Sequence, residues 1–215
     1  MHRAEYPGSL SSLQQELLRA LDVYGDGFFL TGGAALAGFY GSARPTRDLD
    51  LFTRDPEVFK QASRVVDCVA QALMCEMENL RTFPHFRRYR FRKDDEAVVL
   101  DFVREEVSAV YPPVAVDGWK LRVDRLEEMA INKICALVSR GEVRDLEDLE
   151  FMAKAGIDLG SALTLSVRKD GGIGSDTLLI GLQSYAPSVL SDTVERFRQK
   201  WIEQLKAELY RAEPP

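Results

Sequence analysis

Histidine and cysteine are scarce in this chain of 215 residues, which contains two histidines and three cysteines. The cysteines, Cys68, Cys75 and Cys135, form no C-x-x-C pair, which argues against a zinc site or a disulfide framework and favours reduced thiols in the cytoplasm. With so few histidines, His-centred metal sites and Ser-His-Asp triads are not expected. An enzyme built from this sequence must therefore rely on carboxylates, lysine and arginine.

Long apolar runs and an excess of positive charge are also missing. No segment approaches the ~20 apolar residues of a membrane-spanning helix, and the first ten residues lack the apolar core of a signal peptide. We therefore expect a cytoplasmic protein without a membrane partner. The 28 Lys and Arg against 34 Asp and Glu give a net charge of −6, which argues against broad nucleic-acid binding. Basic residues nevertheless gather within 81–93, so a local contact with RNA stays open.

The order of periodic segments predicts an α+β fold, with a small mixed sheet and flanking helices followed by an all-helical C-terminal region. Strands are expected at 28–31, within DLDLFT, and at 85–92 and 97–103, with helices at 9–23, after the Gly pair and at 55–74. Further helices are expected at 125–139, 144–155, 158–169, 175–184 and 191–210. A Pro-rich connection near 110–123 suggests two domains, 1–110 and 111–215.

Three aspartates are placed where a sheet could gather them. Asp48 and Asp50 alternate with leucines in DLDLF, so both carboxylates project from one face of a strand. Asp101 lies inside the apolar strand VVLDFV, where an acid is costly unless it is paired or bound to a metal. Adjacent carboxylates suit Mg²⁺, which accepts them together with substrate phosphates. The pattern therefore predicts a metal site for phosphoryl or nucleotidyl transfer.

A glycine pair precedes the helix that follows the first strand. Gly32 and Gly33 have no side chains, so their backbone can approach a triphosphate closely. The N–H groups at the start of the helix would favour anionic oxygens. We therefore expect Gly32 and Gly33 to bind nucleotide.

These motifs, in this order, resemble a known family. The Gly-Gly turn, the R-P-T-R-D-L-D stretch and the third aspartate are similar to the AbiEii/AbiGii toxin-like nucleotidyltransferases, within the DNA polymerase beta-type superfamily. Segment 126–152 resembles that family's K-x(6)-R-x(3)-R-D-x-x-D-L motif through Lys133, Arg140, Arg144, Asp145, Asp148 and Leu149. The chain departs from the family at one point, because it has Gly-Gly where many superfamily members have Gly-Ser. The contact of the serine hydroxyl with a nucleotide phosphate is therefore either missing or supplied by Thr31, which would then bind nucleotide.

The resemblance implies a nucleotidyltransferase fold and an enzyme that moves a nucleoside monophosphate from an NTP to a hydroxyl and releases pyrophosphate. It implies two Mg²⁺ ions, with Mn²⁺ as an alternative, both held by Asp48 and Asp50. Asp101 would bind one ion and help to deprotonate the acceptor. Lys133 would neutralise the triphosphate, while Asp145 would either position groups in the site or pair with Lys133 or Arg140. The helical domain would thus contribute Lys133 and Asp145 to the cleft.

The same resemblance implies a toxin-like protein of a bacterial toxin–antitoxin or phage-defence system, with tRNA or other RNA as acceptor and an antitoxin as partner. Arg88, Arg90 and Arg92 share one strand face and could bind RNA phosphates, or could simply form a solvated sheet face. A small-molecule nucleotidyltransferase acting on aminoglycoside-like acceptors is a second candidate. A non-catalytic nucleotide- or partner-binding module is a third.

Less specific interpretations exist for the same residues. Asp48 and Asp50 could belong to an ordinary solvated strand face. Asp101 could pair with an arginine on the adjacent hairpin strand. Lys133 could be a surface lysine that lies along its helix, and Asp145 could be an ion-pair partner within its own helix region.

Overall fold

The computed structural model describes residues 9–212, which fall into two compact units divided between Arg125 and Leu126. The first unit is α+β and the second consists of helices, which confirms the predicted fold class. The segment after residue 110 belongs to the first unit, because Arg122–Val123 (β6) pairs with Phe29–Thr31 (β1).

The first unit is built on a six-stranded mixed sheet with the strand order β3-β4-β5-β2-β1-β6. Its four longer strands are β2 (Asp48–Thr53), β3 (Glu76–Phe83), β4 (Phe86–Lys93) and β5 (Glu96–Arg104). β2 runs parallel to β5 and antiparallel to β1, while β4 lies antiparallel between β3 and β5. The two strands that carry the candidate aspartates are therefore direct neighbours.

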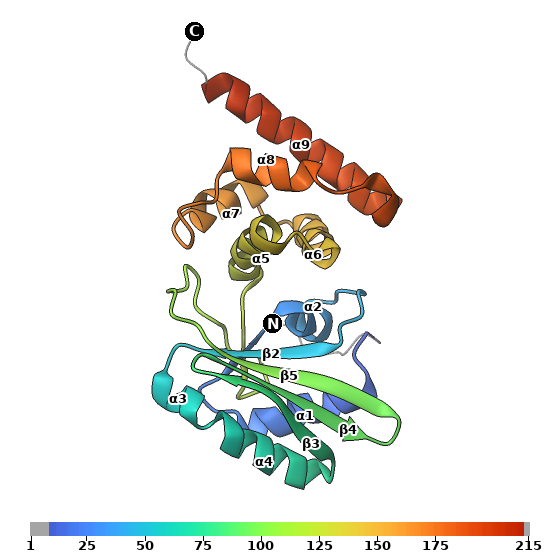
Figure 1. Ribbon diagram of the computed structural model, residues 1–215, viewed down its shortest axis with the longest axis vertical. Coiled ribbons are helices and arrows are strands. Elements are labelled where there is room, and N and C mark those ends of the chain that lie inside the picture. Colours follow the sequence, from blue (N-terminus) through green and yellow to red (C-terminus); the bar gives the residue numbers. More distant parts are fainter. Residues whose placement is uncertain (1–8, 213–215) are drawn as a thin grey trace. The chain divides into compact units, whose positions relative to one another are not determined.

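Helices cover both faces of this sheet (Figure 1). On one face lie α1 (Ser12–Tyr24), α3 (Pro56–Lys60) and α4 (Ala62–Leu73). The short helix α2 (Gly32–Phe39) lies on the other face, against β1 and β2. The expected single helix 55–74 is two helices, and Asp55 caps the first of them through the N–H groups of Glu57 and Val58.

The sequence analysis missed β3 and β6. β3 is an edge strand whose side chains are mostly exposed, so it lacks the alternation of apolar and polar residues that predicts a half-buried strand. Its pairing partner β4 does show that alternation, with Tyr89 and Phe91 buried. β6 is only two residues long and has no sequence signal of its own.

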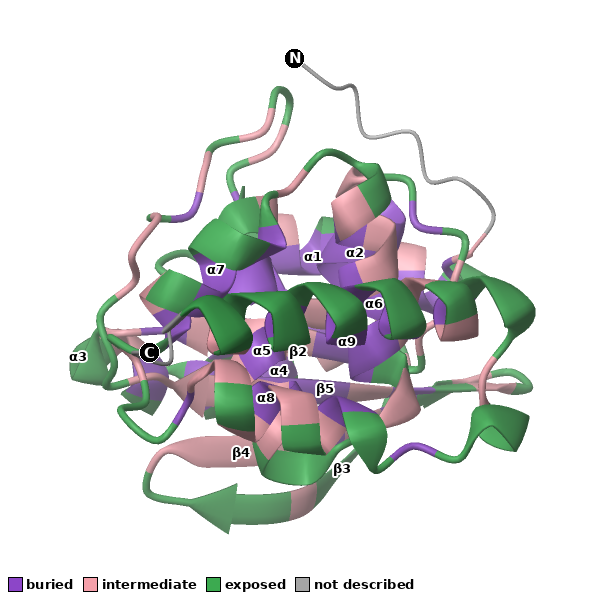
Figure 2. Cartoon of the chain, turned by 90° about the horizontal axis from the view of Figure 1, so that it is seen from above, coloured by how far each residue is buried: buried purple, intermediate pink, exposed green. Residues whose placement is uncertain are grey.

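The second unit contains the helices expected after Asp124. They are α5 (Leu126–Arg140), α6 (Val143–Lys154), α7 (Leu159–Ser166), α8 (Ser175–Gln183) and α9 (Asp192–Ala212), with a short 3₁₀ turn at Pro187–Val189. α5 packs against α6, α7 and α8, and α9 packs against α6 and α8. Figure 2 shows that α9 turns an exposed side outward along its length. Among residues 9–212, no helix is long and apolar enough to cross a membrane.

Candidate active site

Asp48 and Asp50 project from the face of β2 that carries α2. Along β2, half-buried and buried residues alternate, and Leu49 and Leu51 are completely buried in the core. Asp101 on β5 stands in register with Asp50 and is 4% exposed. The sheet therefore brings the three predicted carboxylates onto two adjacent strands.

Asp101 has an arginine partner on the next strand. Arg88 on β4 lies opposite Asp101 and donates from Nε to Oδ1 at 2.8 Å and from Nη2 to Oδ2 at 2.6 Å. This hydrogen bond is the largest cause of a raised pKa at Arg88, and the charges of Asp48 and Asp50 also raise it. Arg88 thus lies within the electrostatic reach of all three carboxylates.

The Gly32 backbone touches the Asp50 carboxylate. Gly32 has φ +69°, in the left-handed region that favours glycine, and a Cβ placed there would lie 2.4 Å from Asp50 Oδ2. At Gly33 a Cβ would lie 2.9 Å from Thr46 Oγ1 and 3.0 Å from Arg44 Nη2. The start of α2 therefore lies beside both the Asp50 carboxylate and the Arg44 guanidinium.

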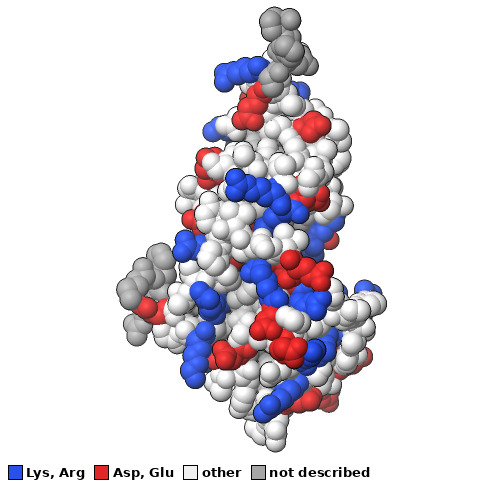
Figure 3. All heavy atoms as spheres, turned by 90° about the vertical axis from the view of Figure 1, so that its left-hand side faces the viewer, with Lys and Arg blue, Asp and Glu red and all other residues white. Residues whose placement is uncertain are grey.

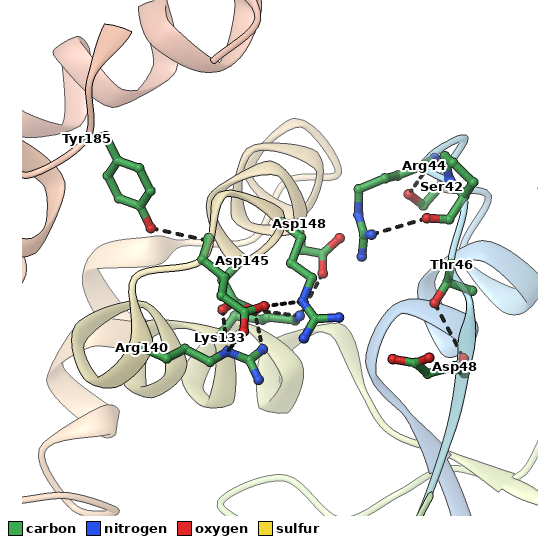
Figure 4. A network of polar contacts seen from close by, with 12 residues as sticks. Ser42, Arg44, Thr46, Asp48, Lys133, Arg140, Asp145, Asp148 and Tyr185 are labelled. Atoms are coloured by element: carbon green, nitrogen blue, oxygen red, sulfur yellow. Dashed lines mark hydrogen bonds and ion pairs between the residues drawn. The ribbon is translucent and has the colours of Figure 1, made fainter. Parts of the chain in front are cut away.

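Two residues of the R-P-T-R stretch make hydrogen bonds in the loop beside this turn (Figure 4). Thr46 donates to the backbone oxygen of Asp48 at 3.4 Å, and the Arg44 N–H donates to Ser42 Oγ at 3.3 Å. The sequence analysis noted this stretch only for its resemblance and did not assign Arg44 a role. Its position beside Gly33 is set by tertiary packing rather than by spacing.

Thr31 is engaged with a buried aspartate that the sequence analysis also missed. Its hydroxyl donates to Asp124 Oδ2 at 2.9 Å, and the Asp124 N–H donates to the Leu30 oxygen at 2.8 Å. Tyr40 donates its hydroxyl to the backbone oxygen of Asp124 at 2.7 Å. Asp124 thus ties β1 and α2 to the end of β6.

In the second unit, Lys133 and Arg140 of the K-x(6)-R-x(3)-R-D motif form a charge network around the buried carboxylates of Asp145 and Asp148 (Figure 4). Lys133 Nζ lies 2.8 Å from Asp145 Oδ1 and 2.7 Å from Asp148 Oδ2. Arg140 donates to both oxygens of Asp145, at 2.8 Å each. Asp145 therefore pairs with both cations that the sequence analysis considered for it.

The network changes the acid–base behaviour of two groups. Burial opposes the ionisation of Asp145, but the hydrogen bonds and charges of Arg140 and Lys133 outweigh it and hold the pKa of Asp145 below its usual range. Burial, together with the negative charges of Asp145 and Glu142, raises the pKa of Tyr185 to about 12. The Tyr185 hydroxyl donates to the Glu142 backbone oxygen at 3.2 Å. Over the physiological pH range Asp145 is therefore ionised and Tyr185 is protonated.

The two other arginines of the strand face predicted to bind RNA, Arg90 and Arg92, are paired with an acid. Arg90 lies 3.1 Å and Arg92 3.9 Å from Glu78 on β3. On the face drawn in Figure 3, basic and acidic side chains are interspersed rather than separated into regions of one sign. Across residues 9–212, no three His, Cys, Asp or Glu side chains are gathered as a ready metal site.

Nearly the whole chain matches one known protein family. Residues 16–214 match the family model described as nucleotidyl transferase AbiEii toxin, type IV toxin–antitoxin system. The chain belongs to the AbiEii nucleotidyltransferase toxin family. This membership confirms the resemblance and makes the chain a nucleotidyltransferase. No curated protein matches the chain at a significant level.

Solved structures share the fold of this AbiEii-family chain. JHP933 from Helicobacter pylori is 20% identical with a TM-score of 0.59, and the match covers 94% of this chain and 97% of that one. MenT4, a nucleotidyltransferase toxin from Mycobacterium tuberculosis H37Rv, is 20% identical with a TM-score of 0.61, covering 90% of this chain and 82% of that one. At this identity the likeness shows the fold alone.

Proposed function

We propose that this AbiEii-family protein transfers a nucleoside monophosphate from an NTP to a hydroxyl group of an RNA acceptor, with tRNA as the first candidate, in a divalent-metal-dependent reaction. The observation that carries the proposal is the placement of Asp48, Asp50 and Asp101 on two neighbouring strands, with Asp50 beside the Gly32 turn. Such a grouping joins metal-binding oxygens to a backbone that can receive phosphates.

The donor set fits two Mg²⁺ ions, or Mn²⁺ in their place. All three side chains offer carboxylate oxygens, the ligands that hard cations prefer. Asp48 and Asp50 would hold both ions, and Asp101 would hold one after giving up hydrogen bonds to Arg88. The bound ions supply positive charge to the phosphates and make the acceptor hydroxyl more acidic.

The protein's own residues would then position the reactants. The acceptor oxygen attacks the α-phosphorus, the bond from that phosphorus to the pyrophosphate oxygen breaks, and Asp101 helps to take the hydroxyl proton. The backbone of Gly32 and Gly33 and the Arg44 guanidinium would hold the triphosphate, with Thr31 fixing the turn through Asp124.

The second unit would supply a positive charge, the ammonium group of Lys133, and the carboxylates that hold it. Lys133 would neutralise part of the triphosphate, as the family motif suggests. Asp145 and Asp148 would hold its ammonium group in place, since both accept from Lys133 Nζ. On this account Asp145 is a positioning residue.

RNA is the proposed acceptor and an antitoxin protein the proposed partner. Arg90 and Arg92 lie on the carboxylate face of β4 and could exchange Glu78 for RNA phosphates, while Arg88 would do so only after leaving Asp101. An antitoxin protein would be the biological partner, because the family is described as part of a type IV system.

Labelled nucleotide transfer tests this function. The full chain is incubated with each α-³²P NTP, Mg²⁺ and, in separate reactions, total tRNA, a protein extract or an aminoglycoside. Label in the tRNA that depends on Asp48 supports the proposal. Label only in protein or aminoglycoside refutes the RNA acceptor, and the absence of label in every reaction refutes the enzymatic proposal.

A further inference from the structure

The helix α2 begins without the side-chain cap that the sequence offers. Thr31 directly precedes Gly32, the first residue of this helix, and its backbone is extended, as is usual for an N-cap residue. A threonine at this position commonly accepts a hydrogen bond from one of the first N–H groups of the helix. The Thr31 side chain makes no such bond. Its hydroxyl is engaged elsewhere.

The partner of this hydroxyl is the buried carboxylate of Asp124. The hydroxyl donates to Asp124 Oδ2 at 2.9 Å, and the two residues are 7% and 1% exposed. A hydrogen bond to a carboxylate is stronger than one between neutral groups, and low exposure to water strengthens it further. A hydroxyl carries one proton to donate. While this bond is kept, Thr31 therefore cannot donate a hydrogen bond to a phosphate.

The backbone of Asp124 is held independently of its side chain. Its N–H donates to the Leu30 oxygen at 2.8 Å, and its backbone oxygen accepts from the Tyr40 hydroxyl at 2.7 Å. Tyr40 is the C-cap of α2, so Asp124 contacts residues at both ends of this helix. A change of the Asp124 side chain leaves both backbone bonds possible and removes the carboxylate that holds the Thr31 hydroxyl.

The start of α2 is also where the proposed function places the triphosphate. The first N–H groups of a helix have no partner within the helix, and they attract anionic oxygens. A hydroxyl that capped these groups would compete with the phosphates for the same donors. The bond to Asp124 turns the Thr31 hydroxyl away from them and removes this competitor.

We propose that Asp124 is a positioning residue of the nucleotide site, which holds the Thr31 hydroxyl away from the start of α2 and so keeps this helix end open to the phosphates of the NTP. The inference rests on the proposed function and adds to it a residue that touches no substrate. It also makes Thr31 a held group rather than a phosphate ligand.

Isothermal titration calorimetry with inorganic triphosphate and Mg²⁺ tests this role without an acceptor and without transfer. Asp124→Ala releases the Thr31 hydroxyl to cap α2, so it should weaken triphosphate binding on the order of tenfold, the scale of one hydrogen bond. Asp124→Asn keeps an acceptor for the hydroxyl and should bind within about threefold of wild type.

A rescue variant separates this role from a merely structural one. Thr31→Val replaces the hydroxyl by a methyl group and should bind triphosphate within about threefold of wild type, because the lost hydroxyl touches no phosphate. The double variant Asp124→Ala/Thr31→Val has no hydroxyl to cap α2, so it should regain the affinity that Asp124→Ala loses. Thr53→Val is the matched control, since Thr53 is a buried threonine of β2 whose hydroxyl accepts from the Asp55 N–H. It should bind like wild type.

Three results would overturn the inference. They are an Asp124→Ala affinity equal to that of wild type, a double variant as weak as Asp124→Ala, and a tenfold loss in Thr31→Val alone, which would make the hydroxyl a phosphate ligand. Circular dichroism checks that each variant is folded. If Asp124→Ala does not fold, Asp124→Leu takes its place in both the single and the double variant, because leucine fills the space without offering an acceptor.

The same titrations separate this inference from the proposed function. Nucleotide transfer by the wild type, together with equal triphosphate affinity in wild type and Asp124→Ala, refutes this inference alone. Absence of transfer to every acceptor, together with the expected order of affinities, refutes the enzymatic proposal and supports this inference. A wild type that binds no triphosphate overturns the inference whether or not it transfers nucleotide.

Discussion

Arg88 donates two parallel hydrogen bonds to Asp101, the most buried carboxylate of the candidate active site. The charge of Asp101 is thus neutralised by an arginine on the neighbouring strand. The pair is possible because the register of β4 and β5 sets the two residues opposite each other. A divalent ion that binds Asp101 must compete with this guanidinium. If the protein binds metal as proposed, metal binding and the stability of the sheet would therefore be coupled.

Replacing Arg88 by Gln should make folding depend on metal. Loss of one partner from a buried ion pair costs about 3–5 kcal/mol, and Mg²⁺ would recover part of this by becoming the counter-ion of Asp101. We expect a larger rise in melting temperature on adding Mg²⁺ to Arg88→Gln than to wild type. Arg90→Gln, whose partner is the exposed Glu78, should behave like wild type. An equal Mg²⁺ effect in all three proteins would contradict the coupling.

Gly32→Ala should damage the site more than Gly41→Ala. Both glycines have left-handed φ angles, but a Cβ at Gly32 meets Asp50 Oδ2 at 2.4 Å, while a Cβ at Gly41 meets nothing within 4 Å. The shared backbone strain costs about 1 kcal/mol, so only Gly32→Ala should also displace the carboxylate. Thermal unfolding and nucleotide transfer measure the two effects. Similar transfer rates in both variants would show that contact with Gly32 does not position Asp50.

Asp145→Asn should destabilise the second unit by about 3–5 kcal/mol, because Lys133 and Arg140 lose their shared counter-ion. The lowered pKa of Asp145 sets the pH dependence. The stabilisation by the ionised carboxylate is present above the unfolded-state pKa of about 3.9 and is lost as the pH falls through the lower folded-state pKa. Denaturant unfolding at pH 7 and at decreasing pH should show the two proteins converging in acid. The exposed Asp176→Asn is the control, and an equal loss there would refute the network.

Tyr185 should resist ionisation up to a pH near 12. Its folded-state pKa lies above the unfolded value of about 10, so its contribution to stability is full below pH ~10 and is lost as the pH rises through about 12. Absorbance titration of the phenols, compared between wild type and Tyr185→Phe, isolates this group. A difference spectrum that titrates near pH 10 would contradict the buried setting.

Local patterns predict the aspartates better than they predict their partners. Alternation in DLDLF and VVLDFV indicates the faces of Asp48, Asp50 and Asp101, because strand periodicity is a property of the chain itself. The sequence offered an arginine of the adjacent hairpin strand as a partner for Asp101, but the choice of Arg88 depends on the register of β4 and β5. Asp124 contacts Thr31, and Arg44 lies beside Gly33; no sequence pattern around Asp124 or Arg44 predicts these tertiary contacts. The motif from Lys133 to Asp148 lies on consecutive helices, so its ion pairs could be anticipated.

The most direct test of the central claim, a carboxylate site for nucleotidyl transfer, is the initial rate of α-³²P NMP incorporation into tRNA by wild type, Asp50→Asn and Asp95→Asn. Asp95 lies in the exposed turn between β4 and β5, so its variant removes the same charge outside the site. Metal-held charge stabilisation is worth several kcal/mol, which predicts a loss on the order of 10³-fold in Asp50→Asn at tenfold per 1.36 kcal/mol. Asp95→Asn should retain the wild-type rate. Equal rates in Asp50→Asn and wild type would contradict the account.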